Sequence, residues 1–125
     1  MNKKRPVNLD ISTISMPVTA VVSILHRITG IILFVGLVFL FYAFDLSLQS
    51  QEGFDQVVSV FQTSFLAKFI IWGVVSALMY HLVAGVKHLF MDLGYFEELE
   101  SGRNAAVANL AIATVLIVLA GVWIW

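Results

Sequence analysis

Three long runs of apolar residues dominate the chain, and each is long enough to cross a bilayer as a helix. The predicted spans cover residues 18–45, 66–91 and 104–125. Within them, the runs Ile28–Phe44, Phe69–Val86 and Asn104–Trp125 contain no charged residue, and their one histidine is His81. A transmembrane helix needs roughly 20 mainly apolar residues. The pattern predicts an all-α integral membrane protein, a single transmembrane anchor domain over residues 1–125 with three spanning helices.

Two polar connections separate these spans. The first, Asp45–Lys68, contains a Val- and Phe-rich stretch that predicts a short helix at the membrane interface. The second, Lys87–Arg103, predicts a helix extension followed by a polar turn. Pro17 suits the first turn of a helix, because the N–H that it lacks would be unpaired there anyway.

Lysine and arginine near the ends of the spans predict the orientation in the membrane. The first connection carries only Lys68, whereas the other side carries the remaining basic residues: Lys3, Lys4, Arg5, Arg27, Lys87 and Arg103. We therefore expect a cytoplasmic N-terminus and an outward-facing C-terminus. Trp123 and Trp125 then fit an aromatic belt at the outer interface.

The composition supports lipid as the main solvent and narrows the chemistry. Of the 125 residues, 60% are hydrophobic and 12% are charged, against about 25% charged in soluble domains. The net charge of −1 gives no basic excess for nucleic acid. The absence of cysteine excludes disulfides, iron–sulfur clusters and thiolate zinc sites on this chain. We expect no cleavable signal, because polar residues follow the N-terminal basic group.

A stripe of polar and small residues marks one face of the first span, near its predicted cytoplasmic end. It consists of Thr19, Ser23, His26, Arg27 and Gly30. One interpretation is that Arg27 is a positive-inside anchor that reaches water, with His26 beside it. The other is a binding site for a polar ligand head, such as a carboxylate or carbonyl, since ionisable groups within a span mark functional sites.

The second span carries His81 on a face that it shares with Ala77, Ala84, Gly85 and His88. Such small neighbours leave room for a flat macrocycle, but they are also common where two helices pack closely. If His81 binds a haem iron, a second protein chain is the simpler source of the opposite ligand. His88 is about 10.5 Å from His81 along the helix axis and cannot bind the same iron.

Three stretches together resemble the cytochrome b membrane-anchor subunit of bacterial succinate dehydrogenase, respiratory complex II. The resemblance covers nearly the whole chain, including its length and its three spans. The stretches are RPVNLD (5–10), SILHRITG (23–30) and YHLVAGVKHLFMDLGY (80–95).

The resemblance implies a multi-pass subunit of the bacterial inner membrane that packs with a second small anchor subunit. The two would hold an iron–sulfur subunit and a flavoprotein subunit, which carry the iron–sulfur clusters and FAD. One haem b would lie between the two anchors, with His81 as the axial ligand from this chain. Ubiquinone would bind near the cytoplasmic interface as the electron acceptor.

The resemblance also assigns roles to the polar residues. Ser23 and Arg27 match positions at the quinone site. His26, together with Arg27, matches positions near the haem propionates. Asp92 matches an acidic position near the quinone. For His88, contact with a propionate and simple exposure to water remain alternatives.

Other functions are consistent with parts of this pattern. The anchor subunit of a fumarate reductase would run the reverse reaction on the same framework. A small proton channel would use His26 and His81 as a relay, and it requires a polar path across the whole membrane. A purely structural anchor leaves both the polar stripe and His81 without a role.

Overall fold

Four α-helices make up the computed structural model, which describes residues 16–125. They are α1 (Val18–Gln49), α2 (Gln51–Thr63), α3 (Phe65–Asp92) and α4 (Leu99–Ile124). Helices α1, α3 and α4 are long and apolar enough to cross a membrane. The prediction of an all-α membrane protein with three spanning helices is confirmed. The first motif stretch, 5–10, lies outside the described residues, as do Lys3, Lys4 and Arg5.

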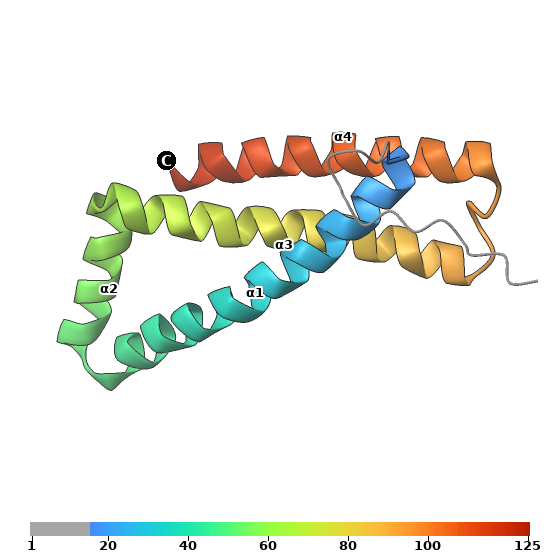
Figure 1. The fold of residues 1–125 in the computed structure, drawn as a ribbon. Coiled ribbons are helices and arrows are strands. Elements are labelled where there is room, and N and C mark those ends of the chain that lie inside the picture. The colour runs from blue at the N-terminus through green and yellow to red at the C-terminus, as the bar shows by residue number, and fades with distance from the viewer. Residues whose placement is uncertain (1–15) are drawn as a thin grey trace, which may run out of the picture.

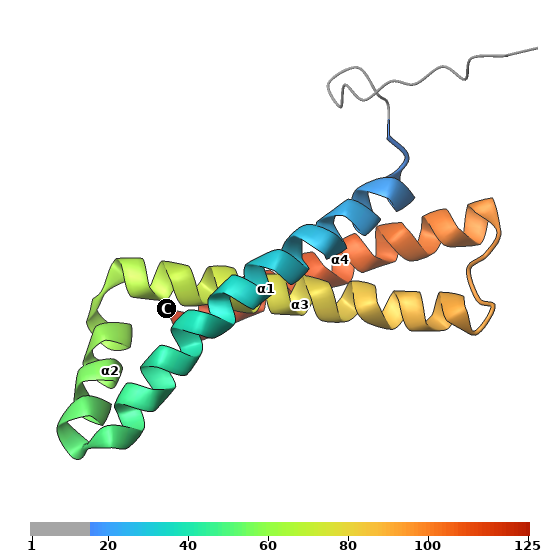
Figure 2. The same cartoon turned by 60° about the horizontal axis from the view of Figure 1, so that its bottom comes forward.

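Helices α3 and α4 lie side by side as an antiparallel pair, and α1 crosses them obliquely (Figures 1 and 2). Towards one end α1 diverges from α3, and α2 runs crosswise between the end of α1 and the start of α3. The 32 residues of α1 give a length of about 48 Å, more than the roughly 30 Å hydrocarbon core. An upright helix would therefore protrude from the membrane, whereas a tilted one keeps more of its length in lipid.

The short helix predicted between the first two spans is present as α2, and serine residues cap both of its junctions. The Ser50 hydroxyl accepts a hydrogen bond from the Gly53 amide at 2.9 Å, and the Ser64 hydroxyl accepts one from the Ala67 amide at 3.2 Å. These side chains satisfy amides that a helix start leaves without a partner. The two serines thereby separate α1, α2 and α3 into three helices without a long loop.

Two helices extend several residues beyond the predicted spans, and α3 extends one residue beyond at each end. Helix α1 continues four residues past the predicted end, where the Gln49 amide donates to the Asp45 carboxylate at 3.0 Å, one turn away. Helix α4 begins at Leu99 rather than 104, and the Gly102 amide donates to the Glu98 carbonyl at 2.8 Å. Hydropathy predicts where a helix leaves the lipid. The helix itself is longer, because its backbone hydrogen bonds continue into the polar residues that flank the apolar run.

Small residues bring the three spans together near the start of α1. Val22, Ala84, Ala106 and Ala113 are almost fully buried, and they form one cluster with Tyr80. The Tyr80 hydroxyl donates to the Val22 carbonyl at 3.0 Å and so joins α3 to α1. Most large apolar side chains instead point outward, as expected where lipid is the solvent.

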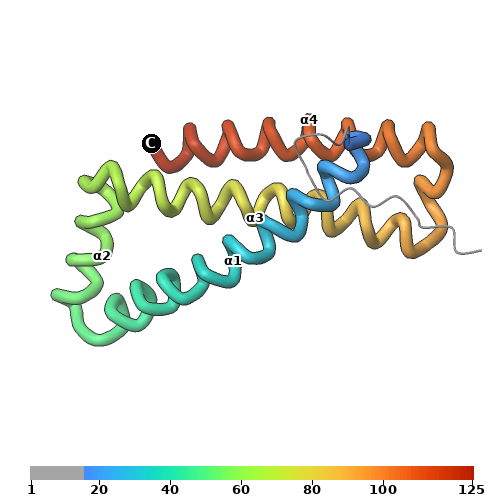
Figure 3. The backbone as a smooth tube through the Cα atoms, viewed as in Figure 1, coloured from blue at the N-terminus to red at the C-terminus, as the bar shows by residue number. Residues whose placement is uncertain are grey.

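The other ends of α3 and α4 meet at a group of aromatic residues. The Trp72 indole N–H donates to the Ile117 carbonyl at 2.9 Å, and the Trp125 ring packs on Trp72 at 5.8 Å between centroids. Trp123 points outward and is 83% exposed. The chain ends beside the junction of α2 and α3 (Figure 3). Both predicted belt residues therefore lie at the end opposite the α3–α4 turn.

A short turn joins α3 to α4, and two of its residues have a left-handed backbone. Gly94 has φ +94° and Phe96 has φ +61°. Phe96 has a side chain that disfavours this conformation. Its ring packs edge-on against Phe90 at 6.2 Å, and Phe90 also contacts Tyr95 at 6.0 Å. This aromatic packing stabilises the turn that returns the chain into the membrane.

Candidate functional site

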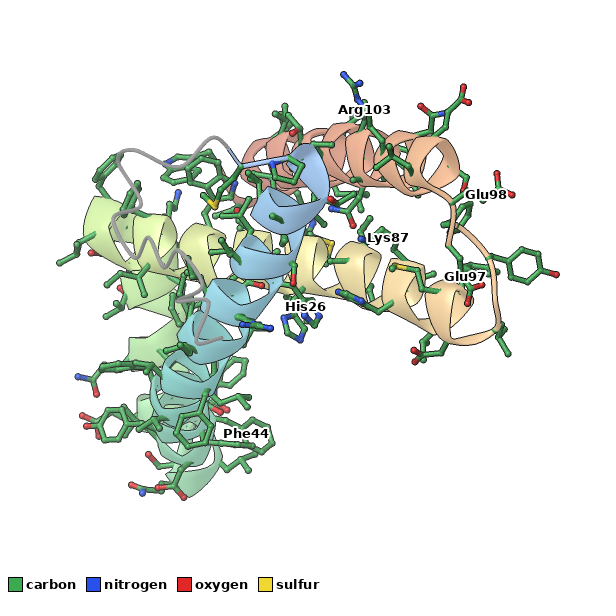
Figure 4. All side chains as sticks on the ribbon, turned by 45° about the vertical axis from the view of Figure 1, so that its right-hand side comes forward. His26, Phe44, Lys87, Glu97, Glu98 and Arg103 are labelled. Carbon is green, nitrogen blue, oxygen red and sulfur yellow. The ribbon has the colours of Figure 1, made fainter. Side chains whose placement is uncertain are left out.

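Three histidine side chains gather where α1 crosses α3. The His26 ring stacks on the His81 ring with 4.0 Å between centroids and 11° between planes. The His88 ring lies on the other side, 5.0 Å from His26 and tilted by 55°. Figure 4 shows His26 pointing from α1 toward α3. The sequence predicted all three histidines toward the cytoplasmic side, and the structure brings His26 into ring contact with both histidines of α3.

The hydrogen bonds of His81 determine which of its nitrogens is available to a ligand. His81 Nδ1 lies 3.1 Å from the His26 carbonyl oxygen and 3.1 Å from Thr29 Oγ1. A carbonyl oxygen can only accept, so Nδ1 carries the proton. In a neutral imidazole the lone pair is then on Nε2. Metal-binding histidines characteristically donate their other ring N–H to a backbone carbonyl in this way, so His81 fits a haem iron.

Gly30 provides the space for the His81 ring. A Cβ atom on Gly30 would lie 3.2 Å from His81 Cε1, closer than ordinary van der Waals contact. Gly85 is less restricted, because a Cβ there would lie 3.8 Å from His26 Nε2. The glycine that ends the SILHRITG motif therefore matters through its lack of a side chain, which lets α1 approach an imidazole of α3.

If His81 binds haem, as the resemblance implies, we expect Gly30→Ala to reduce haem occupancy about tenfold, the scale of loss when the surroundings of a metal ligand are disturbed. The added methyl group displaces the His81 ring by a few tenths of an ångström. The measurement is the haem-to-flavin ratio of the purified complex. Gly73→Ala is the matched control, because a Cβ at Gly73 meets nothing within 4 Å. Equal haem loss in both variants would contradict the prediction.

The small residues of α3 serve helix packing more than ligand binding. Ala84 is fully buried in the cluster with Val22 and Ala106, and Ala77 is 5% exposed. The interpretation that these alanines open a space for a macrocycle beside His81 is therefore wrong for Ala84. Its methyl group is covered by α1 and α4, and the alternative of a small-residue helix contact applies.

The polar stripe of α1 divides between two directions. His26 and Gly30 face His81, whereas the Arg27 side chain is exposed and Ser23 is half-buried. Within residues 16–125, neither the Ser23 hydroxyl nor the Arg27 guanidinium has a side-chain hydrogen bond. They lie one helical turn apart on α1. Asp92, the last residue of α3, is exposed and is not part of the histidine group.

Sequence reasoning missed two features of this region. The first is Thr29, which lies within the motif but was assigned no role, and which contacts the His81 ring. The second is the burial of Lys87 between α3 and α4, at 9% exposure, close to the 2%-exposed Asn109 (Figure 4). A lysine near a predicted loop is read as a cytoplasmic charge, and no pattern in one sequence indicates that a neighbouring helix covers it.

The chain is similar to known membrane subunits over almost all of its length. The family model described as the succinate dehydrogenase/fumarate reductase transmembrane subunit matches residues 1–120. A succinate dehydrogenase cytochrome b556 subunit of Coxiella burnetii is 41% identical over 125 residues, covering 100% of both chains. One of Paracoccus denitrificans is 36% identical, covering 92% of this chain and 88% of the relative.

A more distant similarity extends to a cytochrome b560 subunit of succinate dehydrogenase from Reclinomonas americana. It is 30% identical over 139 aligned positions, covering 99% of this chain and 88% of the relative. The family model, these relatives and the three spanning helices agree. The chain belongs to the family of transmembrane subunits of succinate dehydrogenase and fumarate reductase.

Proposed function

We propose that this chain is the cytochrome b membrane anchor of a succinate dehydrogenase, that it binds haem b, and that it forms part of the site where ubiquinone is reduced. One observation carries the proposal: His81 Nδ1 donates to the His26 carbonyl, which leaves Nε2 free for a ligand. The names of the relatives, all of them cytochrome b subunits of succinate dehydrogenase, support it.

His81 would hold the haem iron through Nε2, because Nδ1 is bonded to the His26 carbonyl. When bound, a haem with two histidine ligands supplies one-electron transfer without an open position for oxygen. His26 cannot supply the opposite ligand, because its ring lies parallel to the His81 ring at 4.0 Å, beside it rather than across an iron. A second histidine ligand would then come from another chain, which we propose is a second anchor subunit.

The groups on the cytoplasmic side of His81 suit the haem carboxylates. His26 stacks on His81 at 4.0 Å, and Arg27 follows His26 on α1 with an exposed side chain. Both side chains can donate hydrogen bonds to propionates. His88 lies 5.0 Å beyond His26, ring to ring, and extends this group of donors toward the end of α3. Donors to the propionates fix the rotation of the macrocycle and compensate its negative charge at the membrane edge.

Ser23 and Arg27 are the residues that we propose bind ubiquinone. The Ser23 hydroxyl can donate to a quinone carbonyl, and the Arg27 guanidinium stabilises negative charge that develops on the ring oxygen. The exposure of Arg27 allows it to reach a molecule bound between this chain and a neighbouring subunit. Asp92, also exposed, lies at the same end of the fold, where protons are taken up during quinone reduction.

The proposed orientation puts the start of α1 and the α3–α4 turn on the cytoplasmic side of a bacterial inner membrane. This is the side where the iron–sulfur and flavoprotein subunits would dock. Succinate oxidation requires a flavin, and this chain has no glycine-rich dinucleotide fingerprint. We therefore propose that the FAD and the clusters belong to those two subunits. The chain thus contributes the quinone end of the enzyme and no dehydrogenase chemistry.

A histidine-relay proton channel is less consistent with the geometry. The His26 and His81 rings are stacked, so their in-plane N–H groups do not point at each other. The half of α1 beyond Gly30 also exposes Phe34, Val38 and Phe41 rather than polar groups. The anchor of a fumarate reductase would use the same site. The names of the relatives, which are subunits of succinate dehydrogenase, favour a succinate dehydrogenase anchor over a fumarate reductase anchor.

A reduced-minus-oxidised visible spectrum of the purified complex tests the proposal. We expect a low-spin b-type haem in a one-to-one ratio with flavin, reducible by succinate and reoxidised by a ubiquinone analogue. A complex that lacks haem, or one that does not pass electrons from succinate to a ubiquinone analogue, would contradict the assignment. Fumarate reduction faster than succinate oxidation with quinones would favour the fumarate reductase alternative.

A further inference from the structure

We infer that Thr29 is a positioning residue, whose hydroxyl accepts a hydrogen bond from His81 Nδ1–H and so sets the electron-donating strength of the haem ligand. The inference rests on the proposed role of His81. It concerns Thr29, to which neither the resemblance nor the names of the relatives give a role. Thr29 Oγ1 lies 3.1 Å from His81 Nδ1, across the contact between α1 and α3.

The direction of this hydrogen bond follows from the single proton of the hydroxyl. Thr29 Oγ1 donates to the His26 carbonyl at 2.9 Å, one turn earlier in α1. With its proton used there, the oxygen faces His81 Nδ1 with lone pairs only. Nδ1–H is therefore shared between two acceptors, the Thr29 hydroxyl and the His26 carbonyl, both at 3.1 Å.

The three groups form a closed set of contacts that fixes the imidazole. The His26 carbonyl accepts hydrogen bonds from His81 Nδ1–H and from the Thr29 hydroxyl. The Thr29 oxygen also accepts from His81 Nδ1–H, from a second direction. One acceptor alone would determine the tautomer. A second acceptor from another direction also restricts rotation of the ring about its Cβ–Cγ bond, so that Nε2 keeps one direction.

The expected consequence concerns electron affinity rather than binding alone. An acceptor on Nδ1–H makes the imidazole a stronger electron donor, which stabilises the oxidised iron relative to the reduced iron. Removing the hydroxyl should therefore make the haem easier to reduce. The backbone carbonyl remains, so the ligand keeps its tautomer and the haem stays bound.

The test compares Thr29→Val, which keeps the shape and removes the oxygen, with Thr29→Ser, which keeps the oxygen. Potentiometric titration of the haem in the purified complex is the readout. At a fixed ambient potential we expect the ratio of reduced to oxidised haem to rise about two- to tenfold in Thr29→Val, the range that one hydrogen bond provides. Thr29→Ser should stay near the wild-type ratio.

Thr114→Val is the matched control. Thr114 is in α4, and its exposed hydroxyl makes the same kind of bond to its own helix, to the Leu110 carbonyl at 2.7 Å, with no hydrogen bond to a histidine. Its removal should leave the haem titration unchanged. A wild-type titration in Thr29→Val, or an equal shift in Thr114→Val, would overturn the inference.

Two further outcomes separate this inference from the proposed function. A wild-type complex without haem overturns the role of His81 and the role of Thr29 with it. Haem loss from both Thr29→Val and Thr29→Ser, with wild-type haem intact, overturns only the inference, because the site would then depend on the shape of threonine rather than on its oxygen.

Discussion

His81→Ala is expected to produce an assembled complex without haem b. Alanine removes the histidine whose Nδ1 is bonded to a backbone carbonyl and whose Nε2 is left for the iron. The haem-to-flavin ratio should fall more than tenfold. Succinate oxidation with an artificial dye should persist, because the flavin and the clusters belong to other subunits.

Leu82→Ala is the control for this variant. Leu82 follows His81 on α3 but is 55% exposed, so its truncation tests the loss of a neighbouring side chain without touching the ligand. We expect full haem content in Leu82→Ala. A b-type spectrum that survives in His81→Ala would mean that the iron has other ligands, and the proposed function would then fail at its central residue.

Arg27→Leu is expected to lower the turnover of quinone reduction about 100-fold, the usual cost of removing one preorganised donor to developing negative charge. Leucine keeps much of the apolar stem but cannot stabilise a charged ring oxygen. Ser23→Ala should have a smaller effect, about two- to tenfold, because a neutral hydrogen bond is lost. Rates with a ubiquinone analogue and with an artificial dye are compared on the same preparations.

Arg103→Leu serves as the matched control for Arg27→Leu. Arg103 is also exposed and lies in the first turns of α4, at the same end of the fold (Figure 4). Its loss removes an equal charge from that side without removing a group from the polar stripe. If both variants reduce quinone turnover equally, or if Arg27→Leu lowers the dye rate as much as the quinone rate, the role of Arg27 is contradicted.

Hydropathy predicted most of the fold, because lipid imposes a simple rule on helix length and composition. The three spans follow from that rule, the Val- and Phe-rich stretch between the first two spans indicated the short α2, and the structure has all four helices. The helix ends differ because polar pairs such as Asp45 and Gln49 extend α1 beyond the apolar run. Membrane thickness constrains the length of the apolar run, but it does not determine at which polar residue the helix ends.

The candidate site was predictable in its residue types but not in its contacts. The stripe on α1 indicated which side chains are costly in lipid, yet only part of that face meets α3. The rotation of α1 depends on close contacts such as Gly36 against Val74 and Val22 beside Tyr80, which no single helix encodes. For the same reason the sequence could not separate the outward Arg27 from the inward His26.

The bond from His81 to the His26 carbonyl has a consequence for mutational studies of this subunit. The acceptor is main-chain oxygen, so alanine scanning leaves it in place, and His26→Ala keeps the hydrogen bond that orients its neighbour. A mild phenotype at position 26 would thus report on the ring alone. Amide-to-ester exchange between residues 26 and 27 weakens this oxygen as a hydrogen-bond acceptor. It would therefore measure the contribution of the His26 carbonyl to the orientation of His81, which no side-chain substitution can measure.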